Sequence, residues 1–466
     1  MIELGLQRIS RLLSNRPLPW KAVHVAGTNG KGSVCANVSE MLNTYNRSKW
    51  RQRSGHTVLR HGRFTSPHII DRWDCISLSK DDRIETVSSS LFHEVETDLL
   101  KLNHQQVINA SEFELLTATA FTVFTRSKLD LAVVETGMGG RLDATNILGQ
   151  ISEDHTDKGD IDMATFRPRP LVTAITKIGL DHQAFLGDTI EAIAHEKAGI
   201  MKPGVPVLYD RTNEPSVREV LKESALAMGF SRPMLDAYDP PGNEAPIQNL
   251  GPGQEPMHVA TNGQLAFEAT MYALISLGRI SPPPNPTSED QAAHAELIQD
   301  LSKAYQRAYT PGRLEKLHIK MSPGSSSKEM LLDGAHNTQS AEVLGEYVDA
   351  QRRTGQPVAW LLAASDSKDV KEMFQQLLQP NDKVFAVEFG PVDGMPWVKP
   401  MPGAQIVAAA KEVSPELQHV EDCGANIHAA LQSAITAAGD GMLVAAGSLY
   451  LVGDVHRLKR DVLDRQ

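Results

Sequence analysis

Residues 24–33 read HVAGTNGKGS and extend an apolar run that starts at Ala22. Three glycines, a lysine and a serine at the end of such a run are typical of a strand that feeds a glycine-rich turn and then a helix, which is P-loop geometry. Glycine lets backbone N–H groups approach phosphate oxygens, the helix N-terminus adds positive potential, and Lys31 adds a point charge. Because Gly32 stands where the usual pattern has serine or threonine, a tight glycine turn with a solvated lysine remains the alternative.

Length and composition are typical of a globular protein with two domains. The chain has 466 residues, 41% of them hydrophobic, and a formal net charge of −11 with acidic and basic residues interspersed. We expect no nucleic-acid partner, because no basic stripe is present to neutralise phosphates. No run approaches the ~18 apolar residues of a membrane span. Three cysteines without metal-ligand spacing indicate a reducing compartment. We expect a soluble cytoplasmic protein, and the weakly amphipathic start MIELGLQRISRLL leaves a mitochondrial location open.

Short β-branched runs that end in glycine or an acidic residue recur along the chain, and most precede a helical pattern. The runs are 23–26, 131–135, 171–178, 330–333, 359–364, 384–389 and 442–446. This alternation predicts an α/β fold with largely parallel sheets, whose ligands bind at the carboxyl ends of the strands.

Proline, glycine and serine cluster at 239–256, 281–286 and 322–328, which predicts loops there. The stretch 301–313 is the expected hinge between two domains, 1–305 and 306–466. Residues 43–63, rich in arginine and polar side chains, predict no clean element.

Three further stretches place charged side chains just after a predicted strand. AVVETGMGGRLDATN (132–146) places Glu135 at the end of a strand, and a carboxylate at that position beside a P-loop is a candidate magnesium ligand. In ITKIGLDHQAFLGDTIEAIAHEKAGIMK (175–202), His182 follows a strand and Lys197 lies late on the next helix. EMLLDGAHN (329–337) ends a strand with Asp333, and Arg313 stands shortly before it in YTPGRLEKL. Taken singly, each has a bland alternative: a glycine turn with a surface glutamate, a hydrogen-bonded loop histidine, or a solvated lysine on the helix dipole.

Together and in this order, the stretches resemble the folylpolyglutamate synthase and dihydrofolate synthase family, a branch of the Mur-type ligases. The resemblance is carried by TNGKGS, FTSPH (64–68), SEFELLTA (111–118), ETGMGGRLDATN, LDH with LGDT, EKAGI, PGRL and DGAHN, and it covers nearly the whole chain. ELGLQRI near the start, GMPW (394–397) and GSLYLVG (447–453) look most like the monofunctional dihydrofolate synthases of fungi.

This resemblance implies a P-loop, Mur-ligase-like central domain that binds ATP, followed by a smaller Rossmann-like α/β domain for glutamate ligation. It implies that Asn29, Gly30, Lys31, Gly32 and Ser33 hold ATP, together with Arg313 and Asp333. It implies Mg²⁺ ligands at Ser66, Glu135, His182 and Lys197, and Lys197 matches a lysine that is carbamylated in relatives. Lys31, Lys197 and His182 are then the catalytic residues. The pterin substrate is expected at Glu3, Leu4, Gly5, Leu6, Ser111, Glu112, Phe113, Glu114, Leu142, Asp143 and Ala144.

Two departures from the family pattern stand out. Relatives carry an asparagine near the nucleotide in an N-A-x-x-A pattern, and at that place we expect Glu268 in FEATMYA. Extra residues are expected within the arginine-rich stretch before FTSPH and between Ile151 and Arg169, as insertions or as errors in the assembled coding sequence.

The implied reaction spends ATP to make an amide: a carboxylate attacks the γ-phosphate to give an acyl phosphate, and the amine of L-glutamate displaces phosphate. Dihydropteroate is the expected acceptor, and we expect a monomer with small-molecule partners. A folylpolyglutamate synthase that extends a reduced folate would use the same residues. A cell-wall Mur ligase and a nucleotide-binding regulator without ligase activity are the remaining alternatives.

Overall fold

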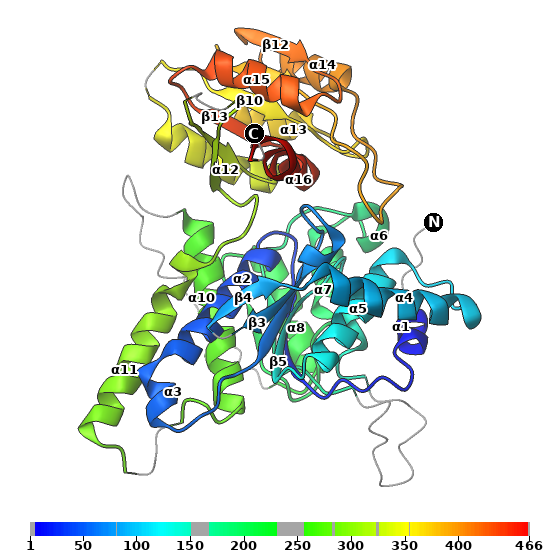
Figure 1. Ribbon diagram of the computed structural model, residues 1–466, viewed down its shortest axis with the longest axis vertical. Coiled ribbons are helices and arrows are strands. Elements are labelled where there is room, and N and C mark those ends of the chain that lie inside the picture. Colours follow the sequence, from blue (N-terminus) through cyan, green and yellow to red (C-terminus); the bar gives the residue numbers. More distant parts are fainter. Residues whose placement is uncertain are drawn as a thin grey trace. The chain divides into compact units, whose positions relative to one another are not determined.

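The computed structural model describes residues 5–80, 82–150, 167–230, 256–281, 285–322, 326–353 and 355–464. The chain folds into two compact α/β units (Figure 1). Unit 1 comprises Met1–Ser66 and Trp73–Tyr309, and unit 2 comprises Pro67–Arg72 and Thr310–Gln466. The predicted α/β class is confirmed. In the described part of the chain, no helix combines the length and apolarity that crossing a membrane requires.

Unit 1 is built on a seven-stranded sheet in the order β4-β3-β2-β5-β1-β6-β7. In chain order the strands are β1 Lys21–Ala26, β2 His61–Phe64, β3 Ile76–Lys80, β4 Arg83–Thr86, β5 Leu131–Glu135, β6 Val172–Ile175 and β7 Val207–Tyr209. Five strands are parallel, and β3 and β4 add an antiparallel edge. β1 and β5 pair with Val25 opposite Glu135, so the glycine-rich turn and this glutamate leave the sheet at the same edge.

Helices cover both faces of this sheet (Figure 1). They are α1 Gln7–Leu12, α2 Lys31–Arg47, α3 Lys49–Arg53, α4 Ser89–Gln105, α5 Glu112–Arg126, α6 Gln183–Leu186, α7 Ile190–Ala198, α8 Pro215–Ala227, α10 Met257–Ser276 and α11 Ser288–Lys303, with short 3₁₀ turns at η1 Arg72–Cys75, η2 Ala144–Ile147 and η4 Ala304–Arg307.

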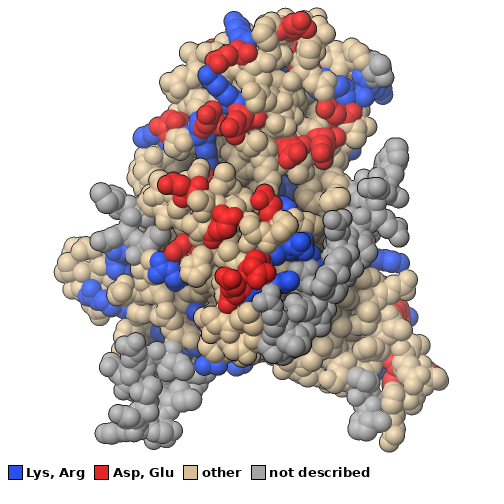
Figure 2. Space-filling model, turned by 180° about the vertical axis from the view of Figure 1, so that it is seen from behind, with Lys and Arg blue, Asp and Glu red and all other residues tan. Residues whose placement is uncertain are grey.

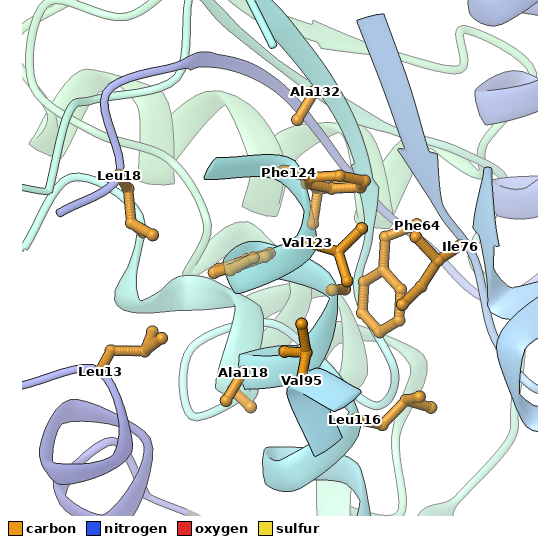
Figure 3. Packing of buried hydrophobic residues seen from close by; sticks show 14 of the residues in the cluster. Leu13, Leu18, Phe64, Ile76, Val95, Leu116, Ala118, Val123, Phe124 and Ala132 are labelled. Carbon is orange, nitrogen blue, oxygen red and sulfur yellow. The ribbon is translucent and has the colours of Figure 1, made fainter. Parts of the chain in front are cut away.

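Alternation along β5 shows how both faces are buried. Ala132 and Val134 pack with α1, α4 and α5, whereas Leu131 and Val133 pack with α2, α10 and α11. Figure 3 shows the first of these cores, where Phe64 of β2 and Phe124 of α5 converge. A strand buried on both faces needs a continuous apolar run, which is why LAVVE could be recognised from sequence.

The arginine-rich stretch is an integral part of unit 1. Residues 43–63 form the end of α2, all of α3 and the start of β2. Trp50 is 1% exposed, donates its indole N–H to Arg279 O at 2.9 Å and packs in the second core. Because a buried tryptophan anchors it, this stretch is not a loose surface insertion.

Unit 2 carries a six-stranded sheet in the order β12-β11-β10-β13-β9-β8, with only β8 antiparallel to its neighbour. Its strands are β8 Glu315–Ile319, β9 Lys328–Leu332, β10 Ala359–Leu362, β11 Lys383–Ala386, β12 His419–Asp422 and β13 Leu443–Ala446. Its helices are α12 Thr338–Gln351, α13 Lys371–Leu377, α14 Gly403–Val413, α15 Ile427–Ala438 and α16 Leu449–Leu458, followed by the π-helical turn η5 Lys459–Leu463. Cores lie on both faces of this sheet as well.

All seven strands predicted from β-branched runs are present, although the runs at 171–178, 359–364 and 384–389 yield shorter strands. The predicted loops at 239–256, 281–286 and 322–328 lie wholly or partly outside the described residues. On the face that Figure 2 shows, acidic and basic side chains are mixed over the surface of each unit.

Candidate active site

The glycine-rich turn between β1 and α2 is shaped by two close approaches. A Cβ on Gly27 would lie 1.8 Å from Thr176 Oγ1, and one on Gly30 would lie 2.5 Å from Asn262 Oδ1. Gly30 also has φ +93°, a conformation that side chains other than glycine rarely adopt. Thr28 N and Asn29 N donate to Lys177 O at 2.9 and 3.1 Å, which ties the turn to the segment after β6. The turn is therefore held by the segment after β6 and by α10, and α2 begins directly at Lys31.

Lys31, Glu135 and Ser66 meet beside this turn. Lys31 Nζ lies 3.8 Å from Glu135 Oε1 and donates to Thr28 O at 3.2 Å. Ser66 N donates to Glu135 Oε2 at 3.2 Å. Glu135 is 4% exposed, and its Oε2 would lie 3.5 Å from a Cβ on Gly32. A buried carboxylate at a strand end thus adjoins the lysine and a glycine of the loop, as the sequence predicted.

Lys197 reaches the same turn from α7. It is 3% exposed and donates its Nζ to Gly27 O at 2.7 Å. Burial lowers the pKa of Lys197 to about 7, the positive charge of Lys31 adds to this, and Asp181 and Asp143 oppose it. At pH 7, an amine with a pKa near 7 is neutral in a large fraction of the molecules, whereas an exposed lysine is almost entirely charged.

The loop after β5 packs directly onto α7. Arg141 N donates to Glu196 O at 2.8 Å, and the Arg141 guanidinium pairs with the Glu196 carboxylate at 2.9 Å. A Cβ on Gly140 would lie 2.7 Å from Lys197 O. Gly140 of ETGMGGR is therefore needed so that this loop can lie against the helix that carries Lys197.

His182 joins this group through Asp181. Its backbone has φ +54°, its N–H donates to Asp181 Oδ1 at 2.9 Å, and its Nε2 lies 3.8 Å from Asp181 Oδ2. The His182 side chain is 47% exposed, in contrast to the buried Glu135 and Lys197. The shared neighbour Asp181 also acts on the pKa of Lys197, so the two predicted ligands lie in one electrostatic neighbourhood.

Residues expected to bind the pterin are held by one another at the start of α5. Ser111 and Glu114 form a capping box, with Ser111 N and Oγ each 2.8 Å from Glu114 Oε2. Arg8 of α1 pairs with the same carboxylate at 2.9 Å. Glu112 opens the helix, and Phe113 stacks on Phe64 at 6.1 Å.

At the N-terminus, Glu3 and Leu4 lie outside the described residues, while Gly5 and Leu6 lead into α1. Leu6 packs against the core that α4 and α5 share, so the described part of this segment borders the start of α5.

Asp143, between Leu142 and Ala144, is the centre of a buried hydrogen-bond chain that the sequence did not reveal. Its Oδ2 accepts from Met138 N at 2.8 Å, and its Oδ1 accepts from Thr145 N at 3.0 Å and from the Thr145 hydroxyl at 2.6 Å. Thr145 Oγ1 lies 2.8 Å from His24 Nε2 on β1. Because the Thr145 proton goes to Asp143, the histidine must carry its proton on Nε2. Burial lowers the pKa of His24 to about 3, so the ring is neutral.

Asn262, which sequence analysis did not single out, borders the glycine-rich turn where Glu268 was expected. Asn262 of α10 is 7% exposed and its side chain borders Gly30. Glu268 instead accepts from Arg211 at 3.3 Å and from Gln264 at 2.8 Å. In the sequence NGQLA, Gly263 stands where the family pattern has alanine, because a Cβ there would lie 2.7 Å from the Tyr305 ring. Allowing this one change in the pattern would have found Asn262.

The two predicted residues of unit 2 lie next to each other. Asp333 is 7% exposed and accepts from Leu314 N and Ala335 N, each at 2.8 Å. Burial raises the pKa of Asp333, and the neighbouring Arg313 guanidinium opposes that rise. An Arg313 nitrogen would lie 3.0 Å from a Cβ on Gly334, so DGAHN and PGRL form one corner of unit 2.

The donors around Glu135 suit Mg²⁺. No group of three or more His, Cys, Asp or Glu gathers in the described residues. Mg²⁺ in phosphoryl-transfer enzymes takes one or two carboxylates and fills its remaining positions with water and phosphate oxygens. Glu135 supplies the carboxylate and the adjacent Ser66 a hydroxyl, so the residues present fit that ion.

Comparison with known proteins gives a consistent result. The family model "Dihydrofolate synthetase, C-terminal domain" matches residues 315–458. The chain is 33% identical to the probable dihydrofolate synthetase of Schizosaccharomyces pombe, over 99% of this chain and 100% of the relative. It is 31% identical to the dihydrofolate synthetase of Saccharomyces cerevisiae, over 98% of each chain.

Solved structures support the same fold. The E. coli FolC protein in complex with DHPP and ADP superposes with a TM-score of 0.68 at 20% identity, covering 100% of this chain and 95% of that one. The folylpolyglutamate synthase of Mycobacterium tuberculosis complexed with ADP and AMPPCP gives a TM-score of 0.67 at 24% identity, covering 97% and 95%.

Proposed function

The chain belongs to the dihydrofolate synthase and folylpolyglutamate synthase family of ATP-dependent ligases, and we propose that it joins L-glutamate to 7,8-dihydropteroate to give dihydrofolate. The full-length relatives from two fungi carry the product of this reaction, dihydrofolate, in their names. ATP and a divalent cation are its cofactors, in keeping with structural neighbours that hold ADP, or AMPPNP with Mn.

One observation carries the proposal: three charged groups from distant parts of the sequence converge on the turn between β1 and α2. Lys31 begins α2, Glu135 ends β5 within 3.8 Å of it, and Lys197 reaches Gly27 O at 2.7 Å. A turn of glycine N–H groups with one lysine and one buried carboxylate is what binding a nucleotide with its metal ion requires.

The chemical problem is to bring a carboxylate onto a polyanion. When bound, ATP with Mg²⁺ supplies the phosphoryl group that converts the acceptor carboxylate into an acyl phosphate, from which the glutamate amine displaces phosphate. Lys31 offsets the charge of the transferring oxygens, and the N–H groups of Gly30, Gly32 and Ser33 line the turn and the start of α2 that would cradle them. The residues named perform positioning and charge stabilisation, so the mechanism needs no nucleophilic side chain.

Lys197 is proposed as a carbamylated ligand. An ammonium beside a metal ion would be repelled, whereas a neutral amine can take up CO₂ and become an anion. The pKa of Lys197, lowered to about 7 by burial and by Lys31, supplies that neutral amine at physiological pH. Ser66, Glu135 and His182 are the other proposed ligands.

We assign ATP binding to residues 1–305 and glutamate ligation to residues 306–466, with Arg313 and Asp333 as proposed nucleotide contacts from the second segment. The proposed acceptor site consists of residues 3–6, 111–114 and 142–144. The protein is proposed to act as a cytoplasmic monomer on small molecules.

The acceptor decides between the two activities of the family. Purified protein is supplied with ATP, Mg²⁺ and glutamate, and dihydropteroate is compared with tetrahydrofolate monoglutamate by phosphate release and product mass. We expect turnover with dihydropteroate, because an acceptor that already bears glutamate would move its reacting carboxylate outward, and near-attack geometry tolerates little more than ~1 Å of misplacement. Turnover confined to the monoglutamate would establish a folylpolyglutamate synthase instead, and equal turnover would establish a bifunctional enzyme.

A further inference from the structure

A short segment from the N-terminal half of the chain belongs to unit 2. Pro67–Arg72, called the strap below, is part of unit 2, although Ser66 before it and Trp73 after it are part of unit 1. The chain therefore leaves unit 1 directly after Ser66, whose N–H is bonded to Glu135 at 3.2 Å.

The strap packs against α16, and the residues that hold it there are called the seat. Ile69 packs against the core that α15 and α16 share, and a Cβ on Gly453 would lie 1.9 Å from Ile69 O. Arg457 Nη2 donates to Ile70 O at 3.1 Å, and Arg460 pairs with Asp71 at 2.6 Å. The missing side chain of Gly453 thus leaves room for the Ile69 carbonyl, and the Arg457 guanidinium binds the Ile70 carbonyl.

The GMPW loop closes this seat. A Cβ on Gly394 would lie 3.1 Å from Arg72 Nε, and Met395 Sδ lies 3.8 Å from Tyr450 Oη. Gly390 N donates to Asp454 Oδ2 at 2.7 Å, and Asp454 also pairs with Arg457. The two sequence stretches GMPW and GSLYLVG, which the proposed chemistry does not use, therefore meet around the strap.

Covalent geometry makes the seat matter for Ser66. Two residues separate Ser66 from Ile69, and an extended chain spans at most about 3.3–3.6 Å per residue. Ser66 therefore lies within a short covalent reach of the Ile69 carbonyl on the strap, and its own N–H is bonded to Glu135. If the strap is held less firmly, the backbone at Ser66 is less constrained as well.

We propose that Gly453 and Arg457, together with the GMPW loop, are positioning residues that hold the strap and thereby place Ser66 as a metal ligand. This inference rests on the proposed function, since it assigns Ser66 to the Mg²⁺ site. Residues that orient a metal ligand without touching the metal typically change metal affinity by roughly 10–100-fold when mutated.

The test compares Gly453→Ala with Gly345→Ala. Both put a methyl group against a backbone oxygen inside unit 2, at 1.9 Å from Ile69 O and at 2.1 Å from Gln376 O, so both carry a similar steric penalty, but only the first touches the strap. Two measurements are made: the rate of tryptic cleavage after Arg72 in the ligand-free protein, followed by mass spectrometry, and Mn²⁺ affinity with a non-hydrolysable ATP analogue, followed by electron paramagnetic resonance.

We expect Gly453→Ala to speed cleavage after Arg72 and to weaken Mn²⁺ binding by roughly 10–100-fold, with Gly345→Ala matching the wild type in both. Equal behaviour of the two variants, or faster cleavage without weaker Mn²⁺ binding, would overturn the inference. Arg457→Lys, which keeps the charge beside Asp454 and loses the planar donor to Ile70 O, repeats the test if Gly453→Ala does not fold. A wild-type protein that neither ligates nor binds Mn²⁺ would refute the proposed function. The cleavage measurement would still show whether Gly453 holds the strap in place.

Discussion

Lys31 is the residue whose role can be tested most directly, because its amine lies at the glycine-rich turn and makes few polar contacts there. Its side chain is 15% exposed, and its amine has only one backbone acceptor and one distant carboxylate among the contacts described above. Its contribution should therefore appear in the reaction and not in the fold.

Lys31→Ala should lower kcat/KM by at least roughly 10²–10³-fold, the loss seen when one charge-stabilising donor is removed, and should leave the thermal midpoint unchanged. Phosphate release and a thermal melt measure the two effects. Lys49→Ala, on α3 with a side chain 72% exposed and paired with Glu296, is the matched control and should retain full activity. A folded Lys31→Ala protein with wild-type rates would refute the P-loop assignment.

Lys197 should make stability depend on pH in a predictable direction. Its folded pKa of about 7 lies below its ordinary value of 10.5, so between these values the unfolded chain holds one more proton. Raising the pH through this window should stabilise wild type relative to Lys197→Met by up to about 1.4 kcal/mol per pH unit. Below the window the difference should level off.

Urea unfolding in CO₂-free buffer without metal or nucleotide measures this difference. Parallel pH profiles of the two proteins would show that the amine is not shifted. In the ligation assay, Lys197→Ala should lose most activity and regain part of it with formate or acetate, which can occupy the position of the proposed carbamate. Full activity of the alanine variant would contradict the ligand role.

At the scale of elements, the buried chain from His24 on β1 through Thr145 to Asp143 ties the strand before the turn to the loop after β5. Thr145→Val keeps the shape of the side chain but leaves the Asp143 oxygen and the His24 Nε2 each short of a partner. We expect a loss of roughly 1–3 kcal/mol in the free energy of unfolding, measured by urea denaturation.

Thr122 provides the control for this prediction. It is 6% exposed on α5, and its hydroxyl is among the buried groups that have no hydrogen-bond partner in the described structure. Thr122→Val should therefore be neutral or stabilising. Similar losses in both variants would mean that the chain through Thr145 contributes nothing beyond burial.

The elements also show what sequence could and could not predict. Strands such as β1, β5 and β13 are buried on both faces and were recognisable from apolar runs. Edge strands such as β4 (RIET) and β12 (HVED) are half exposed and polar, so no run marked them. Near the turn, Lys31 follows β1 and Glu135 ends β5, so both could be singled out from sequence, whereas Asn262 lies far along the chain on α10 and reaches Gly30 only through tertiary packing.

At the scale of the whole molecule, each unit has its own cores, and unit 2 has a buried ionic centre as well. Asp382 has a fully buried side chain and accepts from Arg352 at 2.7 Å, from Val358 N at 2.9 Å and from Trp360 Nε1 at 3.0 Å. One carboxylate thus joins β10, the start of β11 and the end of α12.

Asp382→Ala should destabilise unit 2 by roughly 3–5 kcal/mol, because it leaves the Arg352 charge without its buried partner. Fluorine NMR of fluorotryptophan-labelled protein can follow each unit, since Trp360 lies in unit 2 and the buried Trp20 and Trp50 lie in unit 1. We expect the Trp360 signal to reach its unfolded shift at lower urea while the other two keep their midpoints. A common shift of all three signals would show that the units unfold together.

The strap bears on how this gene can be cut and recombined. A fragment that encodes residues 310–466 would lack the hexapeptide that fills the seat on α16, and a fragment that ends at 309 would carry that hexapeptide without its seat. Chimaeras that exchange unit 2 with a paralogue at a single crossover would mismatch strap and seat in the same way. A functional exchange must also replace the codons for residues 67–72, because unit 2 is encoded by two separate parts of the gene.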